Sequence, residues 1–260
     1  MNKSSWIDKK GFRIAAPIVF GILFVLFWQF GGLHWLLHLR AYDFPLPTQI
    51  IDVFATQYAV LWKHTVITAT EALVGLIIGS VLGFGVAVLA SWFPQWGYGG
   101  LALMSAINAI PTTAMAPFMN NWFGRGMGSK IAVVIFFTMA AMAINTYRGL
   151  TVLPPFSLDL MKSYNATKKE IFFSLRLPNC VPSIFTALKV TTTTSMLSAI
   201  IAEFFSSYAG LGFRVNSVLQ EGKNADGWAY IACSAIVGII MYMIVSVVER
   251  RVTKWHASQR

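Results

Sequence analysis

Charged residues are scarce in this sequence. They make up 12% of its 260 residues, whereas 56% are hydrophobic. Soluble domains carry roughly 25% charged residues. Because so few charges cannot cover the surface of a soluble domain, the composition excludes an ordinary water-soluble protein. Most of the surface is expected to face lipid.

Histidine and cysteine are also rare, and both are dispersed. No histidine clusters with acidic residues; the four are His34, His38, His64 and His256. Metal ligation and histidine-based catalysis need such clusters. We therefore expect no metal site, no cofactor and no catalytic centre. Cys180 and Cys233 lie far apart, at or inside apolar segments, which is typical of buried free thiols.

Acidic residues are half as numerous as basic ones, which leaves a net charge of +10. The basic residues stand in clusters between apolar runs. This pattern sets the orientation of a membrane protein and is not typical of a groove for phosphates. We therefore expect a lipid bilayer around this chain, and no nucleic acid as a partner.

Long apolar runs dominate the sequence. Because about 20 apolar residues span a bilayer as a helix, we predict an all-α, polytopic membrane protein with six transmembrane helices. The predicted spans cover residues 14–39, 64–90, 101–122, 131–147, 182–207 and 228–248. The remaining divisions are an N-terminal tail (1–13), an external connector (40–63), a core with five spans (64–249) and a C-terminal tail (250–260).

Glycine and proline give local predictions within these segments. Pro47 predicts the start of an amphipathic surface helix in the connector. Pro111 and Pro117 interrupt the third span, which is tolerated where helices pack together or line a cavity. Small residues spaced four apart allow a second helix to approach the second span closely. These residues are Gly75, Gly79 and Gly83.

The distribution of lysine and arginine predicts the orientation. With six spans, the two tails, the 91–100 turn and the 148–178 interval share one side. That side holds thirteen basic residues: Lys3, Lys9, Lys10, Arg13, Arg148, Lys162, Lys168, Lys169, Arg176, Arg250, Arg251, Lys254 and Arg260. The other side holds six: Arg40, Lys63, Arg125, Lys130, Arg214 and Lys223. We therefore expect both termini and the 148–178 interval in the cytoplasm.

The polar interval from Ser157 to Pro178 predicts two short helices joined by a tight turn. Ser157 is a favourable N-cap, and Asn165 is a residue type that adopts the left-handed conformation that ends a helix. Thr167 and Glu170 have the spacing of a capping box. Pro178 is expected to end the second helix, since proline removes a backbone donor.

Ionisable and hydroxyl residues within the spans are candidates for a translocation path, because such groups are costly in a membrane. Glu71 and Glu203 are acids within predicted spans, and Thr192 and Ser195 belong to a run of hydroxyls in the fifth span. These hydroxyls could instead bond to helix carbonyls or join helices. Lys189, near the end of the same span, is expected to extend its ammonium towards the interface.

The 157–178 interval resembles the EAA loop of binding-protein-dependent ABC importer permeases. Asp159-Leu160-Met161, Asn165 and Leu175-Arg176-Leu177-Pro178 fall at the spacing of that motif. The motif is diverged, with Asp for Glu, Leu-Met for Ala-Ala and Asn for Gly. Other segments are similar to the nitrate/sulfonate/taurine-type permeases in the same order: Asn108 to Pro111, Trp122 to Gly124, Asn145 to Gly149, Ala202-Glu203 and Ala209 to Gly212.

This resemblance implies a type I permease fold with a cytoplasmic coupling-helix pair. It implies a non-catalytic subunit in a bacterial cytoplasmic membrane, assembled with a second permease copy, a separate ABC ATPase subunit and an external substrate-binding protein. The residues expected to dock on the ATPase are Asp159, Leu160, Met161, Tyr164, Asn165 and Ile171. The implied substrates are small solutes such as a sulfonate, taurine, nitrate or a thiamine-pyrimidine precursor.

Two other classes of protein fit the composition. A membrane-embedded enzyme would need clustered catalytic residues. A secondary transporter would show internal repeats and charged residues at mid-membrane. The sequence shows no convincing repeat, and neither alternative explains the capped polar interval.

Overall fold

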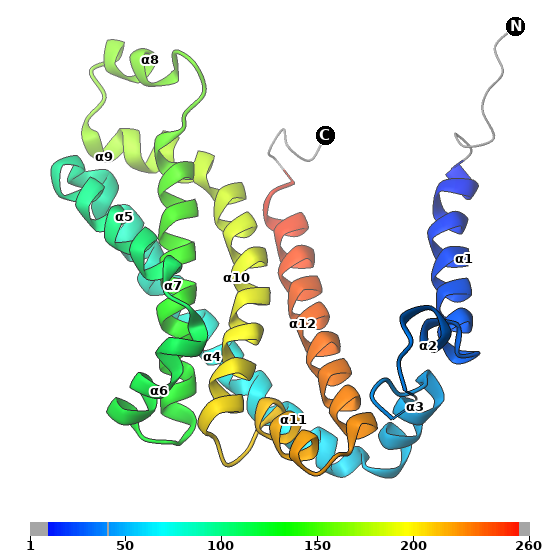
Figure 1. The fold of residues 1–260 in the computed structure, drawn as a ribbon. Coiled ribbons are helices and arrows are strands. Elements are labelled where there is room, and N and C mark those ends of the chain that lie inside the picture. The colour runs from blue at the N-terminus through cyan, green and yellow to red at the C-terminus, as the bar shows by residue number, and fades with distance from the viewer. Residues whose placement is uncertain (1–9, 41, 255–260) are drawn as a thin grey trace, which may run out of the picture.

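The computed structural model describes residues 10–40 and 42–254, and in this part of the chain every regular element is a helix (Figure 1). The all-α prediction is therefore confirmed. Residues 1–9 and 255–260, which contain most of the two predicted tails, lie outside the described residues.

Within residues 10–40 and 42–254, four helices are long and apolar enough to cross a membrane. They are α4 (Tyr58–Trp92), α7 (Met127–Thr151), α12 (Asn224–Val252) and the continuous segment Lys168–Phe205, whose main part is α10 (Leu177–Ser206). A bent pair of helices can form a fifth span, and α1 (Lys10–Gln29) contains a shorter apolar stretch, Ala15–Gln29. These elements approximately match the six predicted spans.

The first and third spans differ from their predictions. The helix α1 ends at Gln29, because Gly31 adopts a left-handed conformation (φ 79°) before the short α2 (Gly32–Leu37). The third span is divided into α5 (Pro94–Ala109) and α6 (Thr112–Phe123), which meet at 100°. The bend falls at Pro111, whose predecessor is extended (ψ 129°), as the residue before a proline prefers. Pro117, by contrast, lies inside α6 without ending it.

The glycine face of α4 packs against α7, as predicted. A Cβ on Gly79 would lie 1.9 Å from the Thr138 hydroxyl oxygen, and one on Gly83 would lie 2.4 Å from the Met139 carbonyl oxygen. The Thr138 hydroxyl also donates a hydrogen bond to the Gly75 carbonyl across the two helices (3.3 Å). These glycines are therefore required by the close approach of α4 and α7.

The connector forms the predicted helix after Pro47, α3 (Pro47–Thr56), at the end of the molecule opposite to the polar interval. Trp28 of α1 stacks on Phe44 (4.9 Å between ring centroids) and donates its indole N–H to the Pro45 carbonyl (3.1 Å). Phe44 also packs edge-on against Trp228 at the start of α12 (5.0 Å). This aromatic cluster joins α1 to the bundle at that end.

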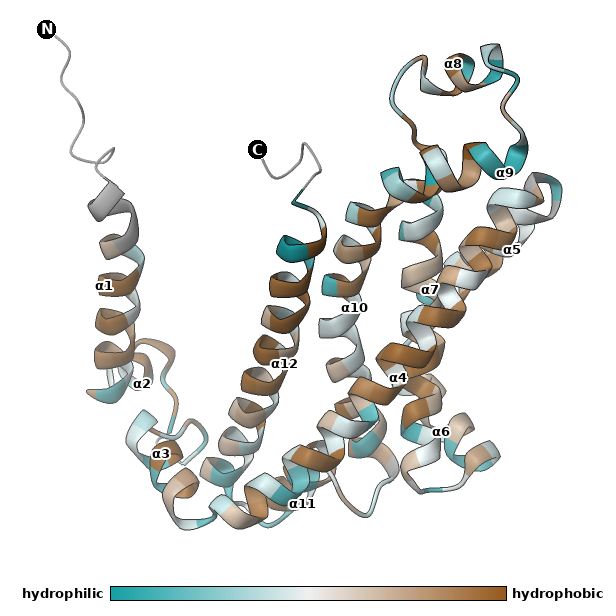
Figure 2. Cartoon of the chain, turned by 180° about the vertical axis from the view of Figure 1, so that it is seen from behind, coloured by the Kyte–Doolittle hydropathy of each residue, from teal (hydrophilic) through white to brown (hydrophobic). Residues whose placement is uncertain are grey.

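The two ends of the molecule differ in polarity. The start of α1, the end of α12, α8 (Ser157–Ser163) and α9 (Lys168–Ile171) lie at one end, and α3, α6 and α11 (Leu211–Gln220) lie at the other (Figure 1). Figure 2 shows hydrophobic residues along α1, α4 and α12, with hydrophilic residues concentrated towards the ends of the molecule. This arrangement agrees with the predicted grouping of segments, while the compartment at each end stays a prediction.

Candidate functional site

The turn between α8 and α9 has the geometry that the sequence predicts. Asn165 is left-handed (φ 57°), its N–H donates to the Lys162 carbonyl (2.9 Å), and the Ala166 N–H donates to the Met161 carbonyl (3.0 Å). This pair of bonds is a Schellman motif, which satisfies carbonyls left free at a helix end. Asn165 therefore stands where the EAA motif has glycine because this position requires a positive φ.

The start of α8 differs from the prediction. Phe156, with φ 62°, precedes the helix, and Ser157 is its first residue; the Ser157 hydroxyl donates back to the Pro154 carbonyl (2.7 Å). A bulky residue in the left-handed region is strained by about 1–3 kcal/mol. The Phe156 side chain is 83% exposed, so no packing in this chain accounts for that strain. Sequence reasoning missed this residue, since no propensity favours phenylalanine there.

The capping box that begins α9 is confirmed. The Glu170 carboxylate accepts from the Thr167 N–H (2.7 Å), and the Glu170 N–H donates to the Thr167 hydroxyl oxygen (3.3 Å). The predicted end at Pro178 is wrong. The helix continues through a π-helical turn, η2 (Phe172–Arg176), into α10, with the Leu177 N–H donating to the Phe172 carbonyl. The wider turn accommodates the proline, which cannot donate to the preceding turn.

The six predicted docking residues lie together on the α8–α9 unit. Asp159, Leu160, Tyr164 and Asn165 are exposed, while Met161 and Ile171 are half-buried. Leu160 is 57% exposed and Tyr164 is 78% exposed. These two residues are four apart, so they share one face of the turn. Within the unit, α8 projects beyond the helix bundle, whereas α9 leads through η2 into α10 (Figure 1). Among the residues that the structure describes, the Leu160 and Tyr164 face therefore stays largely uncovered.

The segment after α9 is anchored to two long helices. Phe172 is buried and packs edge-on against Trp92 at the end of α4 (5.6 Å between centroids). The Asn179 amide donates to the carbonyls of Gly149 (3.2 Å) and Val152 (2.9 Å) at the end of α7. A displacement of the α8–α9 unit would therefore act directly on α4, α7 and α10.

The predicted path residues Glu71 and Glu203 are brought together, but both are buried within the chain. Glu203 is 0% exposed and Glu71 is 2% exposed. The Glu203 carboxylate accepts from the Thr68 hydroxyl (2.7 Å) and from the Gly212 N–H (2.7 Å). Glu203 therefore links α4, α10 and the start of α11.

His64 and Thr68, one turn apart on α4, complete the cap of α11. The Gly210 N–H donates to His64 Nδ1 (3.0 Å), and the Leu211 N–H donates to the Thr68 hydroxyl oxygen (2.8 Å). Helix starts carry backbone donors with no partner inside the helix, and here consecutive donors find side chains. We call His64, Thr68 and Glu203 the α11 cap. From the sequence, His64 was described only as a histidine outside any cluster with acidic residues. Its role in the cap could not be predicted, because its partner is a backbone amide 146 residues away.

Thr192 and Ser195 are also fully buried, and both hydroxyls bond to their own helix. Thr192 donates to the Leu188 carbonyl (2.7 Å) and Ser195 to the Thr192 carbonyl (2.8 Å). This is the alternative that the sequence left open. None of the four predicted path residues presents surface in this chain, so their part in a translocation path stays a prediction.

Lys189 does not extend freely to the interface. Its ammonium forms an ion pair with the Glu249 carboxylate of α12. Both side chains are largely buried, at 24% and 11% exposure. The prediction missed this pair because the two residues lie 60 positions apart on α10 and α12, and their approach depends on the bundle.

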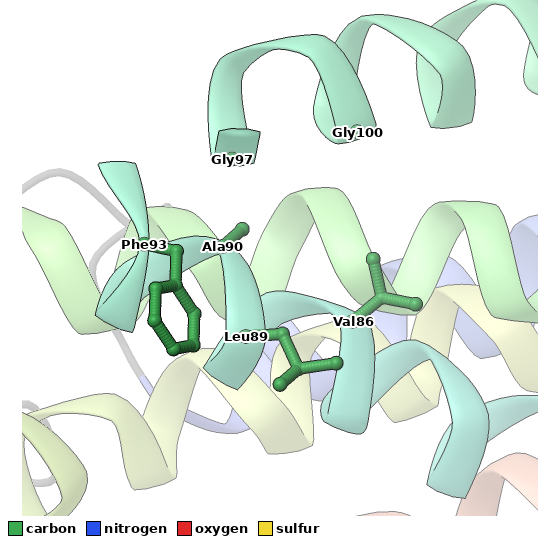
Figure 3. Close-up of a pocket in the computed structure, with 6 residues that line it drawn as sticks. All are labelled: Val86, Leu89, Ala90, Phe93, Gly97 and Gly100. Carbon is green, nitrogen blue, oxygen red and sulfur yellow. The ribbon is translucent and has the colours of Figure 1, made fainter. Parts of the chain in front are cut away.

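No group of three or more potential metal ligands occurs among the residues that the structure describes. One cavity is almost wholly apolar, lined by Val86, Leu89, Ala90 and Phe93 of α4 and by Gly97 and Gly100 of α5 (Figure 3). A Cβ on Gly97 would lie 2.4 Å from the Ala90 carbonyl oxygen. Glycine there lets α5 cross α4 closely, and the cavity offers no polar group for recognising a solute.

Residues 75–254 match the profile of the family described as "Binding-protein-dependent transport system inner membrane component". This match covers more than half of the chain. The chain therefore belongs to this family, and it is a permease subunit of the ABC transporter type. Family membership places it apart from secondary transporters and membrane-embedded enzymes.

Curated relatives agree with this assignment. The chain is 24% identical to the formylaminopyrimidine transport permease ThiX of Halalkalibacterium halodurans, covering 96% of this chain and 100% of that protein. It is 29% identical to a probable ABC transporter permease of Haemophilus influenzae, covering 77% and 81%. It is 24% identical to the taurine transport permease TauC of Escherichia coli, covering 82% and 80%.

The fold is also similar to solved structures. An inward-facing structure of the MetNI methionine ABC transporter aligns with a TM-score of 0.62 and 17% identity, covering 78% of this chain and 97% of the other. At this level of identity the likeness supports the fold alone.

Proposed function

We propose that this chain is the membrane-spanning subunit of an ATP-driven importer, and that the α8–α9 unit docks on a separate ATPase subunit. The observation that carries the proposal is the exposed apolar face of Leu160 and Tyr164 at α8, which projects beyond the bundle (Figure 1). Exposed apolar surface of this kind marks an interaction site. The docking residues are Asp159, Leu160, Met161, Tyr164, Asn165 and Ile171. We add Phe156 to this set because its apolar side chain is exposed.

ATP hydrolysis in that partner would drive helix movements that carry the solute across the membrane. The contacts that anchor the segment after α9 would transmit these movements. Phe172 bears on Trp92 of α4, and Asn179 bonds to the end of α7. The close glycine contact between α4 and α7 makes these helices move as one body. A push on the α8–α9 unit, which we call the coupling loop (Ser157 to Ile171), would thus tilt the α4–α7 pair and expose the path alternately to either side.

A second copy of the permease completes the path in this proposal. Only 6% of the apolar stretch of α12 is buried within the chain, against 56% for α7. Lipid and a second permease share this uncovered surface. An external binding protein would approach the end that carries α3 and α11, opposite the coupling loop. The location is a bacterial cytoplasmic membrane with both termini in the cytoplasm.

The substrate is a small solute that the binding protein delivers. The names of the relatives specify formylaminopyrimidine, taurine, aliphatic sulfonates and nitrate. We propose a substrate of this range: a small organic anion such as a sulfonate or taurine, or nitrate or a thiamine-pyrimidine precursor. In this proposal four buried polar residues position the helices that line the path, without contacting the solute: Glu71, Thr192, Ser195 and Glu203.

A photocrosslinking experiment tests the docking proposal. A benzophenone side chain at Tyr164 should give an adduct with an ATPase subunit in native membranes, identified by its Walker sequence in mass spectrometry. The same side chain at Tyr58, which is 72% exposed at the opposite end, should give none. An adduct at Tyr58 and none at Tyr164 would contradict the proposal. Uptake of labelled taurine, alkanesulfonates, nitrate and formylaminopyrimidine in a deletion strain would identify the substrate.

A further inference from the structure

A basic pocket lies beneath α8, between the coupling loop and the end of α4. Its volume is about 330 Å³. Three cationic side chains line it, each from a different segment: Lys162 from α8, Lys168 from α9 and Arg176 from η2. Ser91 and Trp92 of α4 form another wall. The pocket therefore combines three cationic side chains with the aromatic ring of Trp92.

On α8 the pocket residues lie on the face opposite to Leu160 and Tyr164, whereas Ile171 of α9 belongs both to the pocket lining and to the proposed docking residues. Leu158 and Lys162 line the pocket and are four residues apart, so they share one face. Leu160 and Tyr164 share another, because a step of two residues turns a helix by roughly 200°. An ATPase seated on Leu160 and Tyr164 would therefore leave Lys162 and the α4 wall of the pocket to another ligand.

The positive charge of the pocket is only partly balanced, by one exposed acid next to Lys162. No carboxylate lines it among the residues that the structure describes. Of the acids nearby, one pairs weakly with a pocket lysine and the other is engaged elsewhere. Asp159 lies at 4.0 Å from the Lys162 ammonium and its side chain is 78% exposed, while the Glu170 carboxylate bonds to Thr167. The pocket is thus suited to an anion with several acceptor oxygens.

The position of the pocket indicates where that anion comes from. Trp92 is the last residue of the apolar helix α4, and its ring packs on Phe172. Tryptophan at the end of a span marks the level of the lipid headgroups. Lysine and arginine residues next to the cytoplasmic end of a span are attracted to anionic lipid headgroups.

We propose that this pocket binds the phosphate headgroup of an anionic phospholipid of the inner leaflet. The proposal rests on the cytoplasmic location of the coupling loop given above. Lys162 and Lys168 contact the phosphate oxygens, and Arg176 provides a third cation next to the α4 carbonyl of Ser91, from which its guanidinium lies 3.5 Å. The bound lipid bridges α8, α9 and the end of α4, so it stiffens the loop that transmits the ATPase movement.

The test uses the full-length chain, purified in mild detergent with the subunits that remain bound to it. Binding of short-chain phosphatidylglycerol, of phosphatidylcholine with the same chains and of inorganic phosphate is measured by native mass spectrometry. We expect the wild type to prefer phosphatidylglycerol. The double variant Lys162→Gln/Lys168→Gln should lose about fivefold in affinity for each lysine. Both side chains are exposed, so the variant should fold.

The matched control is Lys169→Gln/Lys223→Gln, which removes the same charge from residues outside the pocket. It should bind phosphatidylglycerol like the wild type. Equal affinity for the two lipids, or unchanged affinity in Lys162→Gln/Lys168→Gln, would overturn the proposal. If inorganic phosphate displaced the lipid at equal concentration, the ligand would be free phosphate and the proposal of a lipid headgroup would be wrong. Loss of a bound ATPase subunit with unchanged lipid affinity would assign the two lysines to ATPase docking instead.

The orientation is tested separately by labelling Lys168→Cys in intact and permeabilised cells. Labelling from outside would contradict the cytoplasmic location on which both proposals rest. Labelling only after permeabilisation, together with no preference for phosphatidylglycerol, would overturn the lipid site alone.

Discussion

Buried polar side chains hold the ends of helices together in this protein. Glu203 shows this most clearly, since its carboxylate joins Thr68 of α4 to the first turn of α11. A buried carboxylate is stable only when donors surround it. The Ala209 to Gly212 turn supplies such a donor from Gly212 and needs glycine at Gly210 (φ 107°) to bring it there.

Replacing Gly210 by alanine should destabilise the protein by roughly 3 kcal/mol. The new Cβ would lie 2.0 Å from the Glu203 carboxylate, in a backbone conformation that only glycine adopts readily. The loss should appear as a lower melting temperature of the detergent-solubilised chain. Gly126→Ala is the control, because Gly126 has φ −78° and no atom near its Cβ position. Equal melting temperatures of the two variants would contradict this account.

The ion pair of Lys189 and Glu249 gives a second prediction at this scale. Lys189→Met leaves the Glu249 carboxylate largely buried without its partner, at a cost of about 2–4 kcal/mol. The double variant Lys189→Met/Glu249→Met should recover most of that loss, because it buries no unpaired charge. Thermal unfolding of the single and double variants measures the difference. A double variant less stable than the single one would show that the ion pair is not the source of the effect.

Among the helices, the α4–α7 contact depends on glycine at defined positions. Gly79→Val should disrupt the contact, since even a Cβ there would meet the Thr138 hydroxyl and the Ile135 carbonyl. Overpacking of this kind costs roughly 1–3 kcal/mol or more. Gly85→Val lies on the same helix with open space around its Cβ position, so it controls for helix propensity. Size-exclusion profiles of solubilised membranes should show aggregation of Gly79→Val and a normal peak for Gly85→Val.

The turn between α8 and α9 is the element that the proposed mechanism depends on. Asn165→Pro cannot adopt φ 57° and removes the N–H that bonds to Lys162. Met161→Glu places a charge at the docking face. Both variants should insert into the membrane but abolish transport-coupled ATPase activity of the assembled complex. Asn165→Gly should retain it, because glycine accepts the left-handed conformation. Normal stimulated hydrolysis in an assembled Asn165→Pro complex would count against the coupling role.

For the whole molecule, the testable property is its orientation in the membrane. Glu221, in the turn before α12, and Ser163, at the end of α8, are exposed at opposite ends. A membrane-impermeant maleimide should label Glu221→Cys in intact cells and Ser163→Cys only after permeabilisation. Cys180 and Cys233 are buried and should stay unlabelled. The reverse pattern would place the coupling loop outside and contradict an importer driven by a cytoplasmic ATPase.

The sequence by itself determined the class of fold and the local geometry of the coupling loop. Apolar length and low charge required helices that cross a membrane. The Gly75, Gly79 and Gly83 spacing, the Thr167 capping box and the left-handed Asn165 were all predictable because they depend on residues within a few turns of each other.

Only the tertiary structure decided which distant residues meet. The α11 cap brings His64 to Gly210, and the ion pair brings Lys189 to Glu249, across spans that no local pattern relates. Pro178 was expected to end a helix, yet a π-helical turn carries the chain past it, because the packing of Phe172 and Asn179 holds both sides in place. Local signals specify where a helix can begin or end, whereas burial and partner groups in the folded bundle decide whether it does.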